Sequence, residues 1–246
     1  MKSNRKARKG TVALAIIASA CAAVFVPSGT ALATDGNGAL VYPPSSTIAG
    51  KTYAEWSAKW WQYVFPIPYK SNPTIDTTGA YCDVAQRGPV WFLAGGPNGP
   101  VTRRCTIYAQ DKPIFFPIIN VECSTQDVPQ LTYPNGFYCT DGDSCKNCAQ
   151  YWGGLVTTTS LTATVDGHDV TGLEHFRFTS APFKFEIPKN NILDPTGAAG
   201  TGLSVSDGYW LMLKPLAPGH HTLHFHGEIP SLSFTVDVTY DLVVAE

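Results

Sequence analysis

Alternation of apolar and polar residues dominates the second half of the chain. In residues 174–180 and 183–188 phenylalanines recur at every second position, and residues 218–230 (PGHHTLHFHGEIP) alternate in the same way. A period of two is typical of β-strands that bury one face. Further short apolar runs, separated by turn-forming Gly and Pro residues, lie at 88–96, 101–109 and 113–123. Many short strands predict a mainly β fold, a β-sandwich or jelly-roll-like single domain.

One segment near the start of the chain has helical spacing instead. In KTYAEWSAKWWQYVFPIP (51–68) the large apolar side chains recur at intervals of three and four residues, as Tyr53, Trp56, Trp60 and Val64. Thr52 and Glu55 match a capping box, in which each side chain satisfies a free amide of the first helical turn. Prolines directly after the stripe end the helix. We expect a short Trp-rich helix whose stripe packs into the core.

Trp61 lies beside this apolar stripe rather than within it. An aromatic side chain at the margin of a helix is available for stacking on a ligand, whereas those of the stripe are expected to pack internally. Trp61 is therefore the candidate binding residue.

Polar, turn-rich segments separate the expected elements. Residues 34–50 predict a flexible lead-in, and residues 51–246 the β-sandwich domain, which carries a surface insert at 124–148. Within the insert, the sequence DGDS at 141–144 is interpreted as a turn, since the other acidic ligands of a calcium loop are missing. Residues 189–208 are Gly-rich and predict a long loop.

The amino-terminal residues 1–33 have the pattern of a secretory signal peptide. Five basic residues precede an apolar run at 11–26, and Ala31 and Ala33 form the small-x-small pattern of a cleavage site. Of the 17 Lys and Arg residues five lie in this segment, so cleavage leaves 12 against 19 Asp and Glu. We therefore expect a secreted, extracellular protein without stable membrane insertion after cleavage. Its acidic balance excludes nucleic acid as a partner, because such binding needs a basic surface.

Six of the seven cysteines follow the expected cleavage site. An even number in an exported chain predicts three disulfides, although six cysteines allow 15 pairings. We favour Cys82–Cys105, Cys123–Cys148 and Cys139–Cys145. A zinc site at Cys145 and Cys148 is the weaker alternative, because the second CxxC pair of a zinc ribbon is missing.

The candidate chemistry is a histidine cluster at 220–226. Alternation places Leu223 and Phe225 on the buried face of the strand and leaves the opposite face polar. That polar face carries the candidate metal ligands His220, His224, His226 and Glu228. His-x-His on a strand can bring two imidazoles to one ion, so a single Zn, Cu or Fe ion is the possible cofactor. A strand that simply exposes neutral imidazoles is the competing interpretation.

Most of the chain also carries a recognisable series of motifs: WSAKWW, NPTIDTTG, GPVWFLAG and PGHHTLHFHG. In these motifs it resembles a family of exported bacterial proteins to which no activity is assigned. The resemblance implies export but neither a reaction nor a site.

Three classes of function remain open. The first is a secreted, disulfide-stabilised binding protein whose partner is an extracellular glycan, a cell surface or another protein. The second is a metal-dependent enzyme at the histidine cluster. The third is a hydrolase that uses carboxylates in or beside loops, the candidates being Asp76, Asp83, Glu122, Asp194 and Asp207. Catalytic residues cannot be named, since the sequence contains neither a nucleophile elbow nor a P-loop.

Overall fold

A computed structural model describes residues 40–127 and 139–246 of the chain. Internal contacts divide the chain into two units, Met1–Ala33 and Thr34–Glu246, and every described residue belongs to the second. The predicted signal peptide, residues 34–39 of the lead-in and residues 128–138 of the insert therefore lie outside the described residues.

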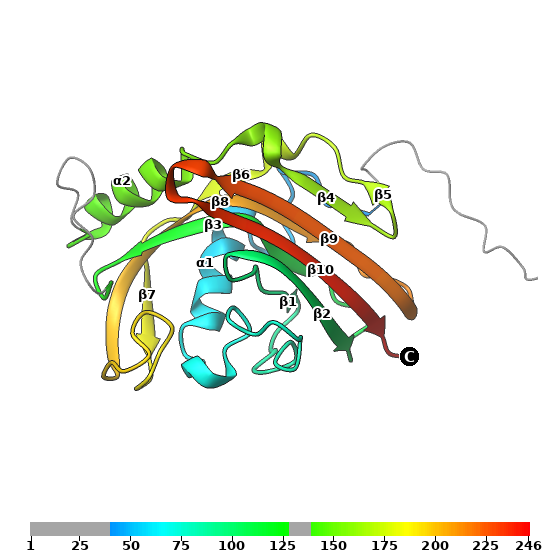
Figure 1. Ribbon diagram of the computed structural model, residues 1–246, viewed down its shortest axis with the longest axis horizontal. Coiled ribbons are helices and arrows are strands. Elements are labelled where there is room, and N and C mark those ends of the chain that lie inside the picture. The colour runs from blue at the N-terminus through cyan, green and yellow to red at the C-terminus, as the bar shows by residue number, and fades with distance from the viewer. Residues whose placement is uncertain (1–39, 128–138) are drawn as a thin grey trace, which may run out of the picture. The chain divides into compact units, whose positions relative to one another are not determined.

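Two five-stranded sheets form the framework of the described chain (Figure 1). The first sheet contains β1 (Trp91–Phe92), β3 (Ile114–Ser124), β8 (Gly200–Leu213), β6 (Arg177–Thr179) and β7 (Phe183–Ile187). Its order is β1-β3-β8-β6, and β7 pairs with the opening residues of β8. The second sheet has the order β2-β10-β9-β4-β5. Its strands are β2 (Gly99–Ile107), β10 (Phe234–Val244), β9 (Gly219–Ile229), β4 (Thr162–Val165) and β5 (His168–Asp169).

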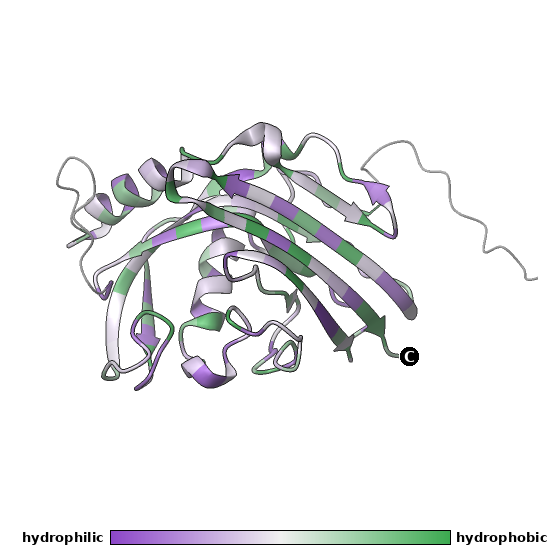
Figure 2. Ribbon diagram, viewed as in Figure 1, coloured by the Kyte–Doolittle hydropathy of each residue, from purple (hydrophilic) through white to green (hydrophobic). Residues whose placement is uncertain are grey.

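The core lies between the two sheets and on the far side of the first sheet. Phe116 of β3 meets Phe225 of β9 with ring centroids 4.9 Å apart. On its other face the first sheet is covered by a helix, so residues 204–213 of β8 are buried throughout. The second sheet is covered on one face only, and its β9 and β10 alternate between polar and apolar residues (Figure 2). The expected mainly β sandwich is confirmed.

The covering helix is α1 (Tyr53–Val64), and its capping box at Thr52 and Glu55 forms as predicted. The predicted stripe is buried and is held by hydrogen bonds as well as by packing. The Trp60 indole N–H donates to the carbonyl of Leu93 at 2.8 Å, and its ring lies 5.5 Å from that of Trp210. These contacts fix the position of α1 on β3 and β8.

The sequence DGDS begins a helix rather than the predicted turn. Asp141 caps α2 (Gly142–Gly153) by accepting a hydrogen bond from the Ser144 amide, and the Ser144 side chain completes the box. Asp at an N-cap is as favourable as Asp in a turn, and packing decides between them here. Short 3-10 helices are η1 (Tyr69–Ser71), η2 (Thr158–Ser160), η3 (Leu173–Phe176) and η4 (Pro230–Leu232).

Two further segments are more regular than their composition predicts. Residues 200–208, expected to belong to the long loop, form the first part of β8, where Gly202 pairs with Phe185. The described part of the lead-in, residues 40–50, contacts the core: Val41 is buried and the Tyr42 amide donates to the carbonyl of Met212. Contacts with the apolar residues of the core hold both segments in place, although the segments themselves are rich in small and polar residues.

Three disulfides connect the cysteines in the favoured pairing. The Cα atoms lie 5.8 Å apart in Cys82–Cys105, 6.0 Å in Cys123–Cys148 and 4.3 Å in Cys139–Cys145. The first joins β2 to the loop before β1. The other two attach α2 to β3 and close the end of the insert. Among the described residues there is no helix with the length and apolar character needed to span a membrane.

Candidate functional site

Strand β9, which carries the histidine cluster, has one buried apolar face and one polar face, as the sequence predicts. Leu223 and Phe225 of β9 are fully buried, and the predicted polar positions lie on the outer face of the second sheet. Two of the histidines there are paired with carboxylates. The Nε2 atom of His224 lies 2.9 Å from Oδ1 of Asp237, and that of His226 lies 3.2 Å from Oε1 of Glu228.

The four predicted metal ligands are not gathered at one point. His220 is exposed and lies six residues from His226, about 20 Å at the rise of a strand. The residue directly opposite it is Val243, and Asp241 lies diagonally across from it at the next outward-facing position of β10. Across residues 40–127 and 139–246 no three His, Cys, Asp or Glu side chains are placed together to hold an ion. The structure instead shows two separate pairs, His226 with Glu228 and His224 with Asp237, a partner that the sequence did not indicate.

Trp61 occupies a different kind of environment, between α1 and the first sheet. Its ring packs edge-on against Trp60, with centroids 5.0 Å apart, and tilts against Phe65 at 5.1 Å. The residue is half-buried. Its indole N–H is fully buried and makes no hydrogen bond to the protein. An unpaired buried donor costs about 1–3 kcal/mol, so it marks a place where a partner would be stabilising.

A cavity of about 130 Å³ lies against Trp61. Its walls come from Trp60 and Trp61 of α1, residues 95–96, residues 117–120 of β3 and the first residues of β10. Asn120 belongs to this wall, and its side-chain Oδ1 is buried without a hydrogen-bond partner. The cavity therefore combines two aromatic side chains with two lining residues, Trp61 and Asn120, that each carry a buried polar atom without a partner. Both atoms are inaccessible to solvent, so each side chain must turn toward the cavity before a ligand can reach its polar atom.

Polar side chains continue from Asn120 along the covered face of β3. Glu122 and Ser124 follow at alternate positions, opposite Ser206 and Ser204 of β8. Ser206 Oγ lies 3.0 Å from Ser57 Oγ of α1, which places this row beneath the helix. Side chains two apart on a strand stand about 6.5–7 Å apart at their bases, so Glu122 is the next polar group beyond the cavity wall.

Glu122 forms the centre of a small carboxyl cluster. Ser204 Oγ donates to its Oε2 at 2.6 Å, and Ser124 Oγ donates to Oδ1 of the neighbouring Asp127 at 2.6 Å. Burial raises the pKa of Glu122 well above its usual range, and the nearby Asp127 carboxylate raises it further. Burial and a like charge both disfavour the ionised form, so Glu122 retains its proton to higher pH than an exposed glutamate.

The other predicted loop carboxylates serve separate local structures. Asp76 accepts hydrogen bonds from Thr78, and Asp194 accepts them from Thr196, as in Asx turns. Asp207 is buried beside α2 and pairs with Arg177 at 2.8 Å. Asp83 lies in the turn region before β1. Among the described residues, none of these four carboxylates forms a hydrogen bond with Glu122, and the carboxylate that raises its pKa is that of Asp127.

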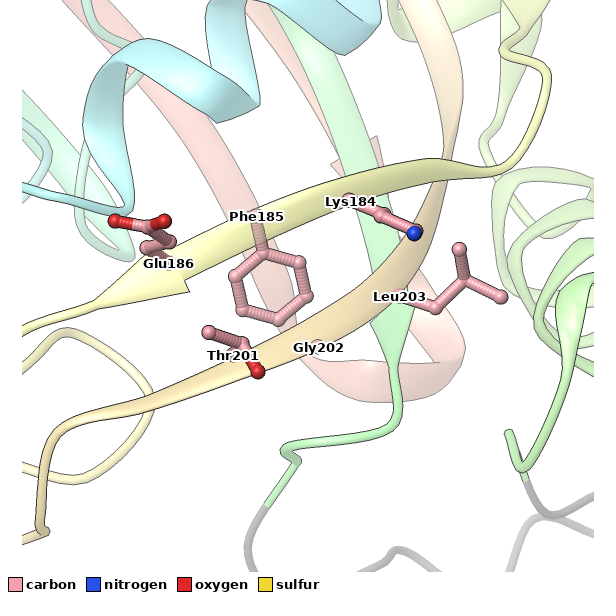
Figure 3. Close-up of a pocket in the computed structure, with 6 residues that line it drawn as sticks. All are labelled: Lys184, Phe185, Glu186, Thr201, Gly202 and Leu203. Carbon is pink, nitrogen blue, oxygen red and sulfur yellow. The ribbon is translucent and has the colours of Figure 1, made fainter.

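A larger and shallower hollow of about 560 Å³ follows the β7–β8 pair (Figure 3). It is lined by three successive cross-strand pairs, Lys184 with Leu203, Phe185 with Gly202 and Glu186 with Thr201. Phe185 is buried and stacks on Phe65 with centroids 4.1 Å apart. The exposed charges of Lys184 and Glu186 have opposite signs, so the hollow has no electrostatic preference of its own.

Comparison of the chain with protein families, with curated proteins and with solved structures finds no match. The functional argument therefore rests on the geometry of the molecule itself. Asn120 and Asp237, the two residues that sequence reasoning missed, become visible only through strand register, because each is an ordinary polar residue in its own strand.

Proposed function

We propose that the protein is a secreted, disulfide-stabilised binding protein whose ligand site is the cavity at Trp61. The observation that carries the proposal is the pair of unpaired buried atoms, Nε1 of Trp61 and Oδ1 of Asn120, on two residues that line one cavity. Ligand sites are concave and largely apolar with a few polar groups that fix orientation. The disulfides and the acidic balance of residues 34–246 agree with an extracellular partner.

The size and lining of the cavity favour a single polar ring. A cavity of about 150 Å³ holds one benzene molecule, so the volume of about 130 Å³ here admits one edge of a sugar ring while the rest of the ring stays outside. An aromatic wall stacks on the apolar face of a sugar ring, while an indole N–H and an amide oxygen suit its hydroxyl groups. We therefore infer that the ligand presents one sugar unit, such as the end of an extracellular glycan.

Binding to a panel of oligosaccharides tests this proposal, followed by titration calorimetry with each glycan that binds. Trp61→Phe and Asn120→Ala should each weaken binding about tenfold or more, since one removes the indole donor and the other the acceptor. Matched controls are Trp152→Phe and Asn147→Ala, both on α2 and away from the cavity lining. Equal thermal stability of all four variants would separate loss of binding from loss of folding. Binding that both cavity variants leave unchanged would refute the site.

A hydrolase is the second candidate, because Glu122 has the raised pKa of a general acid and follows Asn120 on the same face of β3. Release of reducing sugar from the glycans that bind would support it, provided that Glu122→Gln abolishes release and leaves binding intact. Binding without turnover would favour the first candidate.

A further inference from the structure

The outer face of the second sheet brings a carboxylate between the two half-buried histidines of β9. In the β9–β10 register Asp237 lies directly opposite His226, and its Oδ1 is 2.9 Å from Nε2 of His224. Directly opposite residues of an antiparallel pair have Cβ atoms about 4.5–5.5 Å apart. Asp237 is therefore within side-chain reach of both imidazoles, although it is distant from them in sequence.

The polar atoms of each pair are already close together, at the separation of a hydrogen bond. Nitrogen and oxygen ligands lie about 2.0–2.2 Å from zinc in a tetrahedral arrangement, which places two ligand atoms about 3.3 Å from each other. His224 and Asp237 approach to 2.9 Å, and His226 and Glu228 to 3.2 Å. An ion would have to replace the hydrogen bond, with the nitrogen and the oxygen both turned toward it, but their separation would change by only a few tenths of an ångström.

The charge around these residues also favours a cation. The remaining cross-strand neighbours of His224 and His226 are Thr239, Thr162 and Thr164, which are uncharged. Asp237 pairs on its other side with Pro100 of β2. Asp237 and Glu228 thus face the two histidines, and none of the residues directly opposite them is a lysine or arginine. A further carboxylate, Asp241, lies diagonally across from His224, and Arg104 of β2 is the cation opposite Asp241.

We propose that His224, His226 and Asp237 bind one divalent transition-metal ion, with zinc as the test case. In the structure the histidines are paired separately with Asp237 and Glu228, and the described residues hold no assembled group of three ligands. Binding requires the His226 ring to turn about its side-chain torsions from Glu228 toward Asp237, across a face where both side chains are partly exposed. Two histidines and one carboxylate leave a coordination position open to water.

Titration of the tag-free exported protein with zinc tests the proposal, with cobalt absorption as a second readout of coordination. We expect one equivalent of zinc to bind. His224→Ala, His226→Ala and Asp237→Asn should each weaken binding tenfold or more. His220→Ala is the matched control, because His220 lies on the same face of the same strand but far from His226 and outside both histidine–carboxylate pairs, and its loss should change affinity less than twofold.

Three results would overturn the site: no stoichiometric zinc binding, equal losses in His220→Ala and His224→Ala, or unchanged binding in Asp237→Asn. The second would indicate adventitious binding by a histidine-rich strand. Because these residues are at the surface, all variants should melt within a few degrees of the parent protein. The glycan experiment uses other residues, so the two proposals fail or succeed separately.

Discussion

The outer face of β9 and the covered face of β3 both carry polar side chains at alternate positions, yet they are organised differently. On β9, His224 and His226 are partly exposed, and each has a carboxylate partner within 3.2 Å. On β3, Asn120 Oδ1 is buried without a partner and Glu122 lies in a carboxyl cluster beneath α1. Water can replace a lost partner on the first face but not easily on the second. Changing a polar group on the covered face of β3 should therefore alter the free energy of unfolding more than changing one on the outer face of β9.

A substitution that overpacks the covered face of β3 should show the difference between the two faces most strongly. A Cβ atom on Gly208 of β8 would lie 2.5 Å from Cα of Asn120, so the strand must shift. We expect Gly208→Ala to destabilise the protein by about 3 kcal/mol, in the upper range for overpacking. Thr162→Ala on the outer face is the control and should stay within about 0.5 kcal/mol. Urea unfolding measures both, and equal midpoints would mean that the covered face is not tightly packed.

The second test uses the carboxyl cluster and pH. Glu122 has a raised pKa in the folded state, so its protonated form stabilises the fold in acid, and that contribution is lost as pH rises above about 4.5 through the raised pKa. Glutamine cannot ionise, so we expect the Glu122→Gln variant to keep its stability as the pH rises. The variant should exceed the parent in stability at pH 8 by an amount on the order of 1–3 kcal/mol, the cost of a poorly compensated buried polar group.

Thermal unfolding of the parent and Glu122→Gln from pH 4 to 8 measures this difference. Glu186→Gln, at an exposed position of β7, is the matched control and should follow the parent at every pH. A constant difference between the Glu122 variant and the parent across this range would contradict the assigned titration.

The elements of the fold were largely predictable, because local patterns determine them. Alternation located most strands, and Thr52 with Glu55 located the start of α1. The failures concern segments whose composition suits two structures. Asp141 caps α2 although its sequence also suits a turn, and residues 200–208 enter β8 because Phe185 packs over Gly202. In both cases tertiary packing, which a single sequence does not display, makes the choice.

The candidate sites were less predictable for a related reason. His224 and His226 stood out because the local spacing placed them on one face. Asp237 joins them only through the pairing of β9 with β10, and Asn120 joins Trp61 only through the placement of α1 over β3. Strand register and helix placement depend on contacts between residues that are distant in sequence. The local sequence of any one element therefore indicates only some of the residues of a site that several elements form.

A third test asks whether Asn120 serves binding rather than stability. Replacing a buried, unpaired acceptor by an apolar group of similar size removes a desolvation cost. We expect Asn120→Leu to leave stability unchanged or raise it by up to about 1 kcal/mol while it abolishes glycan binding. Thermal unfolding and calorimetry on the same preparation provide both values. A loss of stability greater than about 1 kcal/mol would show that the amide has a structural partner, such as an ordered water molecule.

The smallest expected effect concerns the pair of His224 and Asp237. Both side chains are about one-third exposed, at 35% and 37%, so solvent screens their interaction. A double-mutant cycle with His224→Ala and Asp237→Asn should give a coupling below about 1 kcal/mol that weakens further with salt. Repeating the cycle with saturating zinc should increase the coupling severalfold, since both residues then act through one ion. A coupling that zinc leaves unchanged would assign the pair to an ordinary surface contact and would count against the metal site.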